Sequence, residues 1–345
     1  MRKLEFRSDT MTRPTPAMRD AMRDAEVGDD MCGEDPTVNR LEAMAADLLG
    51  KEAGLFVPSG VFGNQCAIAV HARPGEEVVV SETAHVVEHE QGASAALSGV
   101  QLRTVEPRAA SYLTAAEIAP RIRVDLEDVH IPRTALVVLE NALADGTVMP
   151  LDAMREVREL TNRHGIKVHL DGARLFNAAL ALGVEAKEIA ALVDSVSFCL
   201  SKGLGAPVGS VLCGAREFVR LARRRRKVMG GAMRQAGVLA APGIVALTEG
   251  MARLRVDHEN ARLLAGLFSS IPGITLDLAS VRTNMVYCRV RKDGRSEQGL
   301  VDFLAARGIL VYPALQWGLR FVTSCEVDED DVRALAAAVA DYMEV

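Results

Sequence analysis

Two residues with complementary chemistry follow apolar runs about thirty positions apart in this chain. Asp171 comes directly after the run 166–170, and Lys202 follows the run 193–200. Both runs are apolar, short and rich in β-branched or aromatic residues, which is typical of buried strands. Residues 203–210, after the lysine, are mostly small, so that a flat ligand could approach its amine.

A lysine and a carboxylate at strand ends suit the chemistry of pyridoxal 5'-phosphate (PLP). The amine of Lys202 can hold the cofactor aldehyde as a Schiff base. The carboxylate of Asp171 can keep the pyridine nitrogen protonated, so that the ring accepts electrons. A single lysine after an apolar run is more often a solvated surface charge. The spacing alone therefore leaves both interpretations open.

Strands and helices alternate along the part of the chain that must position these residues. The strands are expected at 53–57, 77–80, 101–105, 134–139, 166–170, 193–200 and 210–213, and the helices at 39–49, 63–72 and 151–164. This alternation predicts an α/β fold, with a mostly parallel central sheet covered by helices on both faces. Ligands of such sheets bind beyond the carboxyl ends of the strands, where Asp171 and Lys202 are expected.

The pattern changes after a long helical stretch that covers residues 215–268. Short strands and helices then follow in a different order, with strands at 274–278, 284–290 and 319–323 and helices at 297–307 and 328–342. This order predicts a small α+β domain. We therefore expect a large domain over 1–250, which includes the N-terminal arm, and a small domain over 251–345.

Further side chains could bind anions near the two strand ends. The turn Pro58-Ser-Gly-Val61 lies between a strand and a helix, where the backbone N–H groups of Gly60 and Val61 could bind a phosphate. The guanidinium groups of Arg174 and Arg320 suit a carboxylate better than a lysine does. A glycine turn can also occur without a ligand, and Arg320 alone could equally form a surface salt bridge.

Composition narrows the functional classes. The chain has 345 residues, 49% of them hydrophobic, and a net charge of −6, which argues against a general nucleic-acid binder. The basic run 223–227 is short and follows a helical pattern, so we interpret it as a helix face or a subunit contact. The six cysteines show no metal-binding spacing, which predicts reduced thiols and no metal site. With no apolar leader and no uncharged run of spanning length, a cytoplasmic location without membrane insertion is expected.

Several longer motifs resemble those of the threonine aldolase family, which are fold-type I PLP enzymes of the β-eliminating lyase superfamily. The resemblance covers nearly the whole chain, through segments 6–15, 26–30, 33–36, 56–60, 63–65, 169–177, 198–203 and 233–237. It implies an aldehyde-lyase that cleaves L-β-hydroxy-α-amino acids, such as threonine or allo-threonine, to glycine and an aldehyde. Two alternatives stay open: β-elimination or racemisation of a related amino acid, and a PLP-binding protein without turnover.

The resemblance also implies roles for individual residues. The expected catalytic set is Lys202 as the Schiff-base lysine, Asp171 as the partner of the pyridine nitrogen and His85 as the ring-stacking histidine. Gly60 and Val61 would bind the cofactor phosphate, and Arg174 would lie near the cofactor. The substrate carboxylate would be bound by Ser8, Arg174 and Arg320. Lys227 and Arg234 match basic residues of a site shared between subunits, in a homotetramer built from catalytic dimers.

Three positions depart from the family pattern. The family commonly has a histidine near the substrate hydroxyl where this chain has Leu143, three residues after Glu140. Leucine cannot accept a proton. Either His85, His89 or a water is then the base, or the substrate carries a bulkier, phenylserine-type β-substituent against Leu143. Cys32 and His89 stand where the family usually has aromatic residues.

Overall fold

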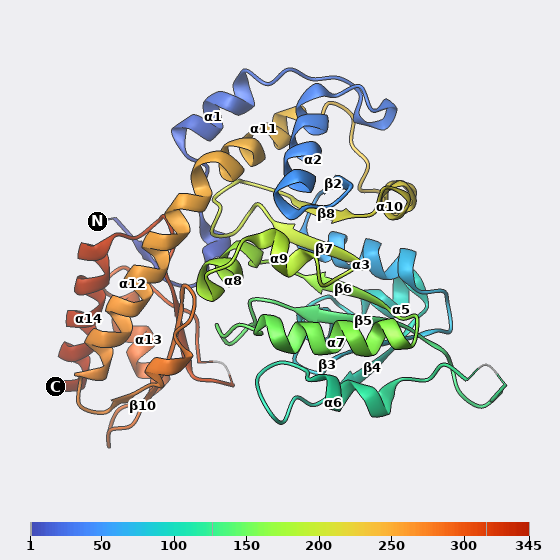
Figure 1. The fold of residues 1–345 in the computed structure, drawn as a ribbon. Coiled ribbons are helices and arrows are strands. Elements are labelled where there is room, and N and C mark those ends of the chain that lie inside the picture. The colour runs from blue at the N-terminus through green and yellow to red at the C-terminus, as the bar shows by residue number, and fades with distance from the viewer. Residues whose placement is uncertain (1, 126, 315, 345) are drawn as a thin grey trace.

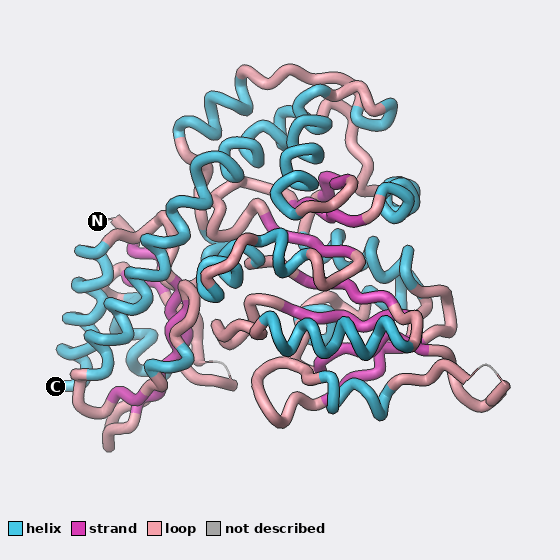
Figure 2. Tube along the Cα trace, in the orientation of Figure 1, coloured by secondary structure: helices cyan, strands magenta, loops and turns pink. Residues whose placement is uncertain are grey.

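The computed structural model describes residues 2–125, 127–314 and 316–344. Figure 1 shows a large α/β part built around one sheet and a smaller α+β part that holds the C-terminus. The tube in Figure 2 shows the strands of the large part enclosed between helices. The α/β fold predicted from the sequence is confirmed.

The central sheet has seven strands in the order β2-β8-β7-β6-β5-β3-β4. Their bounds are β2 Ala53–Val57, β3 Glu77–Ser81, β4 Gln101–Val105, β5 Thr134–Glu140, β6 Lys167–Asp171, β7 Ser195–Cys199 and β8 Ser210–Gly214. Only β8 runs antiparallel to its neighbours, β7 and β2. The other pairs are parallel, so the sheet is mostly parallel, as expected.

Helices cover both faces of this sheet, as the apolar strands require. Val137 of β5 packs in one apolar cluster with Val157 of α7, whereas Val138 packs in another cluster with Ile68 of α3. The helices of this part are α1 Pro16–Arg23, α2 Pro36–Leu49, α3 Gly60–His71, α4 His85–Glu88, α5 Ala93–Ser98, α6 Ala115–Ile118, α7 Leu151–Arg163, α8 Leu175–Leu182, α9 Ala186–Ala190 and α10 Arg216–Val228.

The small part is a three-stranded antiparallel sheet with helices. The sheet order is β12-β10-β9, with β12 Leu319–Val322, β10 Met285–Val290 and β9 Ile274–Thr275, and the helices are α12 Met251–Ser269, α13 Glu297–Ala305 and α14 Glu329–Glu344. The expected strand 274–278 is shorter in the structure, because Leu278–Ser280 form a 3-10 turn. The N-terminal strand β1 (Leu4–Glu5) pairs with β11 (Ile309–Leu310). The arm therefore begins in the small part and not in the large one.

A continuous helical segment connects the two parts. It consists of α11 (Gly237–Val245), a π-helical turn (Ala246–Gly250) and α12. Residues 229–236 are not helical, so the long helical stretch expected over 215–268 is interrupted by a loop after α10. By length and composition, Gly237–Ser269 could cross a membrane, but 44% of its most apolar window is buried inside the protein. The domain boundary at 250 falls within this segment and stays a prediction.

One residue of the basic run has an internal role in the fold. Arg226 of α10 is only 1% exposed, unlike the surface residue that we expected there. One of its guanidinium nitrogens donates to the Phe56 carbonyl at 2.8 Å, and another lies 2.7 Å from the buried Asp30 carboxylate. Because Phe56 is near the end of β2, Arg226 fixes the strand that leads into the turn 58–61.

Replacing Arg226 by Met should lower the free energy of unfolding by about 3 kcal/mol, because Asp30 would keep a buried charge without its close partner. Urea denaturation followed by circular dichroism measures the change. The control is Arg225→Met on the same helix, where the side chain is exposed and less than about 0.5 kcal/mol is expected. Equal stabilities of the two variants would contradict this role of Arg226.

Candidate active site

The carboxyl ends of β5, β6 and β7 meet at a cavity of about 480 Å³ between the large and small parts. This is the edge of the sheet where a ligand is expected. Most of the residues singled out in the sequence line this cavity: Ser8, Gly60, Val61, His85, Asp171, Arg174, Lys202 and Arg320. The structure therefore brings together residues that lie more than 300 positions apart in the chain.

Asp171 is the last residue of β6 and is 4% exposed. One carboxylate oxygen accepts a hydrogen bond from the Asn64 amide at 2.7 Å, and the other accepts from the Ala173 backbone at 3.0 Å. His169, two residues earlier, contacts the Asn64 amide oxygen at 3.2 Å. Burial lowers the pKa of His169 to about 4, so its ring is neutral near pH 7. Asp171 is thus held in place through neutral donors.

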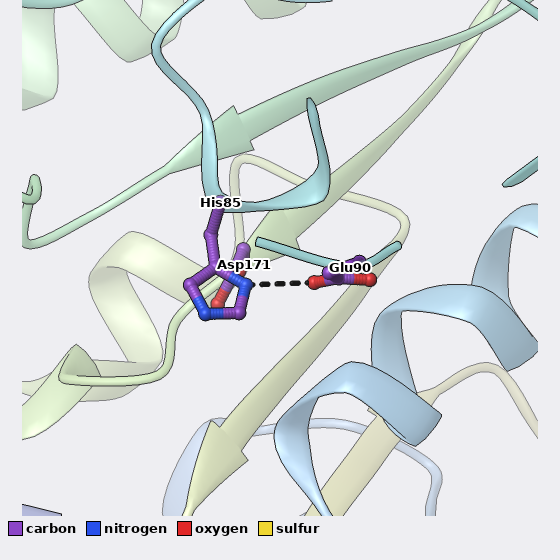
Figure 3. A group of neighbouring side chains, drawn as sticks. All are labelled: His85, Glu90 and Asp171. Carbon is purple, nitrogen blue, oxygen red and sulfur yellow. Dashed lines mark hydrogen bonds and ion pairs between the residues drawn. The ribbon is translucent and has the colours of Figure 1, made fainter. Parts of the chain in front are cut away.

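His85 begins the short helix α4 and lies over the Asp171 end of the sheet (Figure 3). Its Nδ1 is 2.9 Å from Glu90, a carboxylate that is 2% exposed. This hydrogen bond raises the pKa of His85 above its ordinary value, against the opposing effect of burial. The ligand atoms of His85, Glu90 and Asp171 lie within 4.8 Å of one another. The amides of Asn64 and Gln65 already donate to these carboxylates, which accounts for the cluster without an ion.

Glu140 is a carboxylate of this cavity that the sequence analysis did not assign to the site. It ends β5, directly beside Asp171 in the register of the sheet. Its side chain accepts a hydrogen bond from the His85 backbone at 3.0 Å. Burial, together with the nearby Asp171 carboxylate, raises the pKa of Glu140 to about 7. Glu140 can therefore exchange a proton near neutral pH.

Lys202 follows β7 and is half-buried in the cavity wall. The Thr12 hydroxyl donates to the backbone carbonyl of Lys202 at 3.0 Å, so the N-terminal arm fixes the lysine's main chain. The arm reaches this point because β1 is anchored on the small part.

The turn before α3 has the geometry of an anion cradle. Ser59 caps the helix, its side-chain oxygen accepting from the Phe62 backbone at 3.2 Å. A Cβ at Gly60 would lie 2.7 Å from the Cys199 sulfur, so only glycine allows the helix start to approach β7 this closely. The free N–H groups of a helix N-terminus favour an anion such as phosphate.

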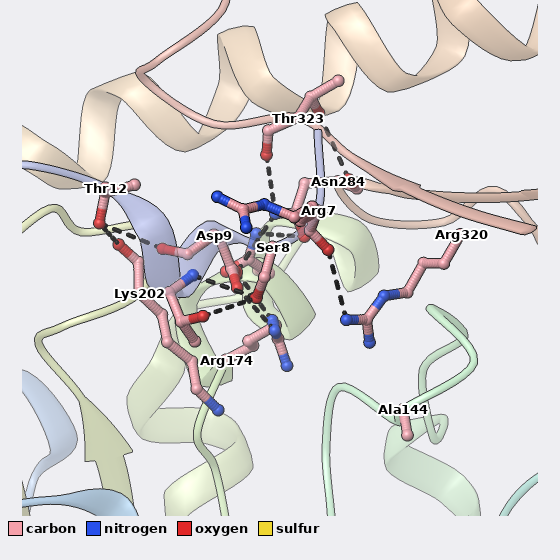
Figure 4. Close-up of polar contacts among 12 residues, drawn as sticks. Arg7, Ser8, Asp9, Thr12, Ala144, Arg174, Lys202, Asn284, Arg320 and Thr323 are labelled. Atoms are coloured by element: carbon pink, nitrogen blue, oxygen red, sulfur yellow. Dashed lines mark hydrogen bonds and ion pairs between the residues drawn. The ribbon is translucent and has the colours of Figure 1, made fainter. Parts of the chain in front are cut away.

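Arg174 and Arg320 both line the cavity, and each contacts the N-terminal arm (Figure 4). Two guanidinium nitrogens of Arg174 donate to both oxygens of Asp9, at 2.8 and 2.6 Å. Burial disfavours the Asp9 charge, but Arg174 outweighs burial and lowers the pKa of this carboxyl to about 2. Arg320 donates to the Arg7 backbone carbonyl at 3.4 Å, and its Nε has no hydrogen-bond partner among the described residues. Two arginines are thus positioned for a carboxylate.

Lys227 and Arg234 do not line the cavity of this chain. Lys227 lies exposed in the last turn of α10, and Arg234 is 65% exposed and pairs with Asp29 at 2.6 Å. Their expected place in a site shared between subunits needs a second copy of the chain and stays a prediction.

Leu143 also lies outside this cavity. Its neighbours Ala142 and Ala144 line the cavity, whereas Leu143 lines an adjoining one. The sequence placed Leu143 correctly in the loop after β5. It could not show which of three consecutive residues faces Lys202, because a loop has no fixed side-chain period.

Three other polar residues of the site were missed as individual residues. Asp9, Asn64 and Glu90 are at most 2% exposed and hold Arg174, Asp171 and His85. Asp9 and Asn64 stand inside the motifs 6–15 and 63–65, and Glu90 follows His85 by five residues. Those motifs could have indicated that Asp9 and Asn64 belong to the site. Which arginine a given carboxylate pairs with can be known only from the tertiary structure.

Comparisons with known proteins show the family of this chain. Residues 5–291 match the family model of the β-eliminating lyases. The chain is 42% identical over 336 residues to a probable low-specificity L-threonine aldolase 2 of Arabidopsis thaliana, an alignment that covers 96% of this chain and 95% of the relative. It is 41% identical to a low specificity L-threonine aldolase of Escherichia coli K12, with 97% of each chain covered.

Solved structures show the same fold at lower sequence identity. A threonine aldolase of Leishmania major superposes with a TM-score of 0.82 at 21% identity, covering 98% of this chain and 99% of that one. A putative L-allo-threonine aldolase of Listeria monocytogenes gives 0.81 at 20% identity, covering 99% and 97%. The solved structures share the fold of this chain, and the family model and the sequence relatives show its family. The chain belongs to the threonine aldolase group of the β-eliminating lyase family.

Proposed function

We propose that this chain is a carbon–carbon lyase that cleaves threonine, allo-threonine and related L-β-hydroxy-α-amino acids to glycine and an aldehyde. The observation that carries the proposal is the single cavity in which Asp171, Lys202, Arg174 and Arg320 meet. The low-specificity L-threonine aldolases among its relatives support the same reaction.

The cavity also fits PLP, on which enzymes of this family depend. The amides after Ser59 would bind its phosphate, and the Lys202 amine would hold its aldehyde carbon covalently. Asp171 would face the pyridine nitrogen, with the His85 ring against the ring face. When bound, PLP accepts the electron pair released by the breaking carbon–carbon bond.

Other side chains of the cavity would bind the substrate carboxylate or accept a proton from the substrate. Arg174 and Arg320 would bind the substrate carboxylate and so fix the orientation of the bond to be broken. A base must also take the proton of the β-hydroxyl. His85 is a weak candidate, because Glu90 favours its charged form. Glu140 and His89 are the stronger candidates in the cavity, and the pKa of Glu140, about 7, suits a base near neutral pH.

The alternative reactions use the same cavity. Elimination or racemisation would break the Cα–H bond, giving a keto acid and ammonia or the inverted amino acid. We favour carbon–carbon cleavage because two relatives, at 42% and 41% identity, are named for it. Product analysis separates the three reactions. We also propose a homotetramer in the cytoplasm, which size-exclusion chromatography with light scattering and cell fractionation would test.

The Lys202→Ala variant should lose at least about a thousandfold in kcat for threonine cleavage, because no amine remains to hold the cofactor. The assay measures glycine and aldehyde together, and visible absorbance reports bound cofactor. Threonine, allo-threonine and phenylserine should be compared in the wild-type protein.

The matched control is Lys187→Ala, an exposed lysine of α9 far from the cavity, which should keep both turnover and absorbance. Full turnover in Lys202→Ala would rule out the proposed role of this lysine. The phenylserine-type hypothesis would be wrong if threonine or allo-threonine were cleaved more efficiently than every aryl analogue.

The Asp9→Asn variant should raise the KM for threonine about tenfold with a smaller change in kcat. The neutral amide would hold the Arg174 guanidinium less firmly, and this arginine would bind the substrate carboxylate less well. Steady-state kinetics beside Asp20→Asn, an exposed aspartate of α1, would show the difference. An unchanged KM would mean that Asp9 does not position Arg174 for substrate.

The difference in stability between wild type and Asp9→Asn should depend on pH. Asp9 has a lower pKa in the folded protein, about 2, than its ordinary 3.8. Its charge therefore stabilises the fold above about pH 4, and this contribution is lost as the pH falls toward 2. The stability difference between wild type and Asp9→Asn, measured by urea denaturation, should shrink over that range. A difference that stays constant from pH 7 to 2 would contradict the assigned ion pair.

A further inference from the structure

A second cavity, of about 300 Å³, adjoins the one that holds Lys202. It lies beyond the ends of β3 and β5, and the loop after β4 forms another of its walls. Glu140 and Ala144 line both cavities, so the two share a wall. We call this second space the side cavity.

Ala144 has the smallest side chain that could stand at this junction apart from glycine. The Tyr287 hydroxyl donates to the Ala144 backbone carbonyl at 2.7 Å, which fixes the loop against the small part. Ala144 and Arg320 both line the cavity that holds Lys202, and Figure 4 labels the two residues. A substrate whose carboxylate is bound by Arg320 therefore has the opening beside Ala144 within reach of its other end.

The walls of the side cavity combine apolar and aromatic side chains with carboxylates, one of which, Glu140, lies at the junction. Leu113, Leu143 and Met149 are buried, and Trp317 packs edge-on against the Tyr287 ring at 5.9 Å. Its carboxylates are Glu82, Glu106, Glu140 and Asp145.

The charged residues in the described lining of the side cavity are all acidic. None of the described residues that line the side cavity is a lysine, arginine or histidine. Glu106 is paired with Arg108, which does not line the cavity, and burial beside Asp171 raises the pKa of Glu140 to about 7. Glu82 and Asp145 therefore carry most of the negative charge of the lining. An aryl or long alkyl group fits such walls, a cation at its far end is attracted by them, and an anion is repelled.

We propose that the side cavity receives the β-substituent of the substrate and selects neutral or cationic aryl and alkyl groups over anionic ones. This inference rests on the proposed function, because it assumes that Arg174 and Arg320 bind the carboxylate. It assigns Leu143 to the wall of the side cavity, and it makes Ala144 the residue that sets the width of the passage.

A set of substrates of matched size tests the charge selection. Wild-type protein loaded with PLP is assayed with threonine, phenylserine, para-aminomethyl-phenylserine and para-carboxy-phenylserine, with glycine measured in every case. We expect kcat/KM for the cationic analogue to exceed that for the anionic analogue at least tenfold. The double variant Glu82→Gln/Asp145→Asn should reduce this ratio at least threefold.

Two variants test the passage. Ala144→Leu should lower the ratio of kcat/KM for phenylserine to that for threonine at least tenfold, since the larger side chain fills the junction. The matched control Ala109→Leu places the same change on an exposed residue outside both cavities and should leave the ratio unchanged. Should Ala144→Leu fail to fold, Trp317→Ala should raise the KM for phenylserine at least fivefold relative to that for threonine.

The outcomes separate this inference from the proposed function. If the wild type cleaves none of the four substrates, the proposed function is wrong. If it cleaves threonine and phenylserine but treats the cationic and anionic analogues alike, the charge selection is wrong. If Ala144→Leu, or Trp317→Ala in its place, changes both substrates by the same factor, the side cavity does not receive the β-substituent.

Discussion

The buried amide of Asn64 is the interaction on which the geometry of the site depends. Its nitrogen donates to Asp171 and to Glu90, and its oxygen accepts from the Ser197 hydroxyl at 2.8 Å and contacts His169. One side chain of α3 thus joins the end of β6 and the middle of β7 to the segment that carries His85. Because the group is 1% exposed, an unmade hydrogen bond there would be costly, which keeps all these partners in place.

The N-terminal arm supplies the second constraint, on the substrate side of the cavity. Asp9 engages Arg174 of the large part and, at 3.3 Å, the Asn284 amide of the small part. The Thr12 hydroxyl donates to the backbone carbonyl of Lys202, and the Arg320 guanidinium donates to the backbone carbonyl of Arg7. The large part contributes Arg174 and the small part contributes Arg320, and the N-terminal arm fixes the positions of both side chains. The distance between the two parts and the form of the carboxylate site are therefore coupled.

Much of the fold could be predicted from the sequence because its strands are buried on both faces. Runs such as 134–139 and 77–80 are apolar and β-branched, so both their existence and their parallel arrangement could be inferred. The small part was harder: of the run 274–278 only Ile274–Thr275 form a strand, and Asp277 caps the 3-10 turn that begins at Leu278. The pairing of β1 with β11 joins residues about 300 positions apart, which no local pattern encodes.

The candidate site divides in the same way. Asp171 and Lys202 were predictable because each stands at the end of a recognisable strand, and Arg174 and Arg320 because a guanidinium group suits a carboxylate. The resemblance to a family supplied the role of His85. The direction of the Leu143 side chain could not be predicted, because the loop that carries it has no periodic pattern. Glu140 was overlooked because its proton affinity arises from burial beside another carboxylate, a property of the folded state alone.

The pairing of β1 with β11 also determines when the site can form during synthesis. Leu4 leaves the ribosome about 300 residues before its strand partner, Ile309. The sheet that carries Asp171 and Lys202 can fold earlier, since its last strand ends at Gly214. Until the small part is made, the arm that brings Asp9 to Arg174 has no strand to hold it. The ion pair between Asp9 and Arg174 is therefore expected to form only after β11 has been made.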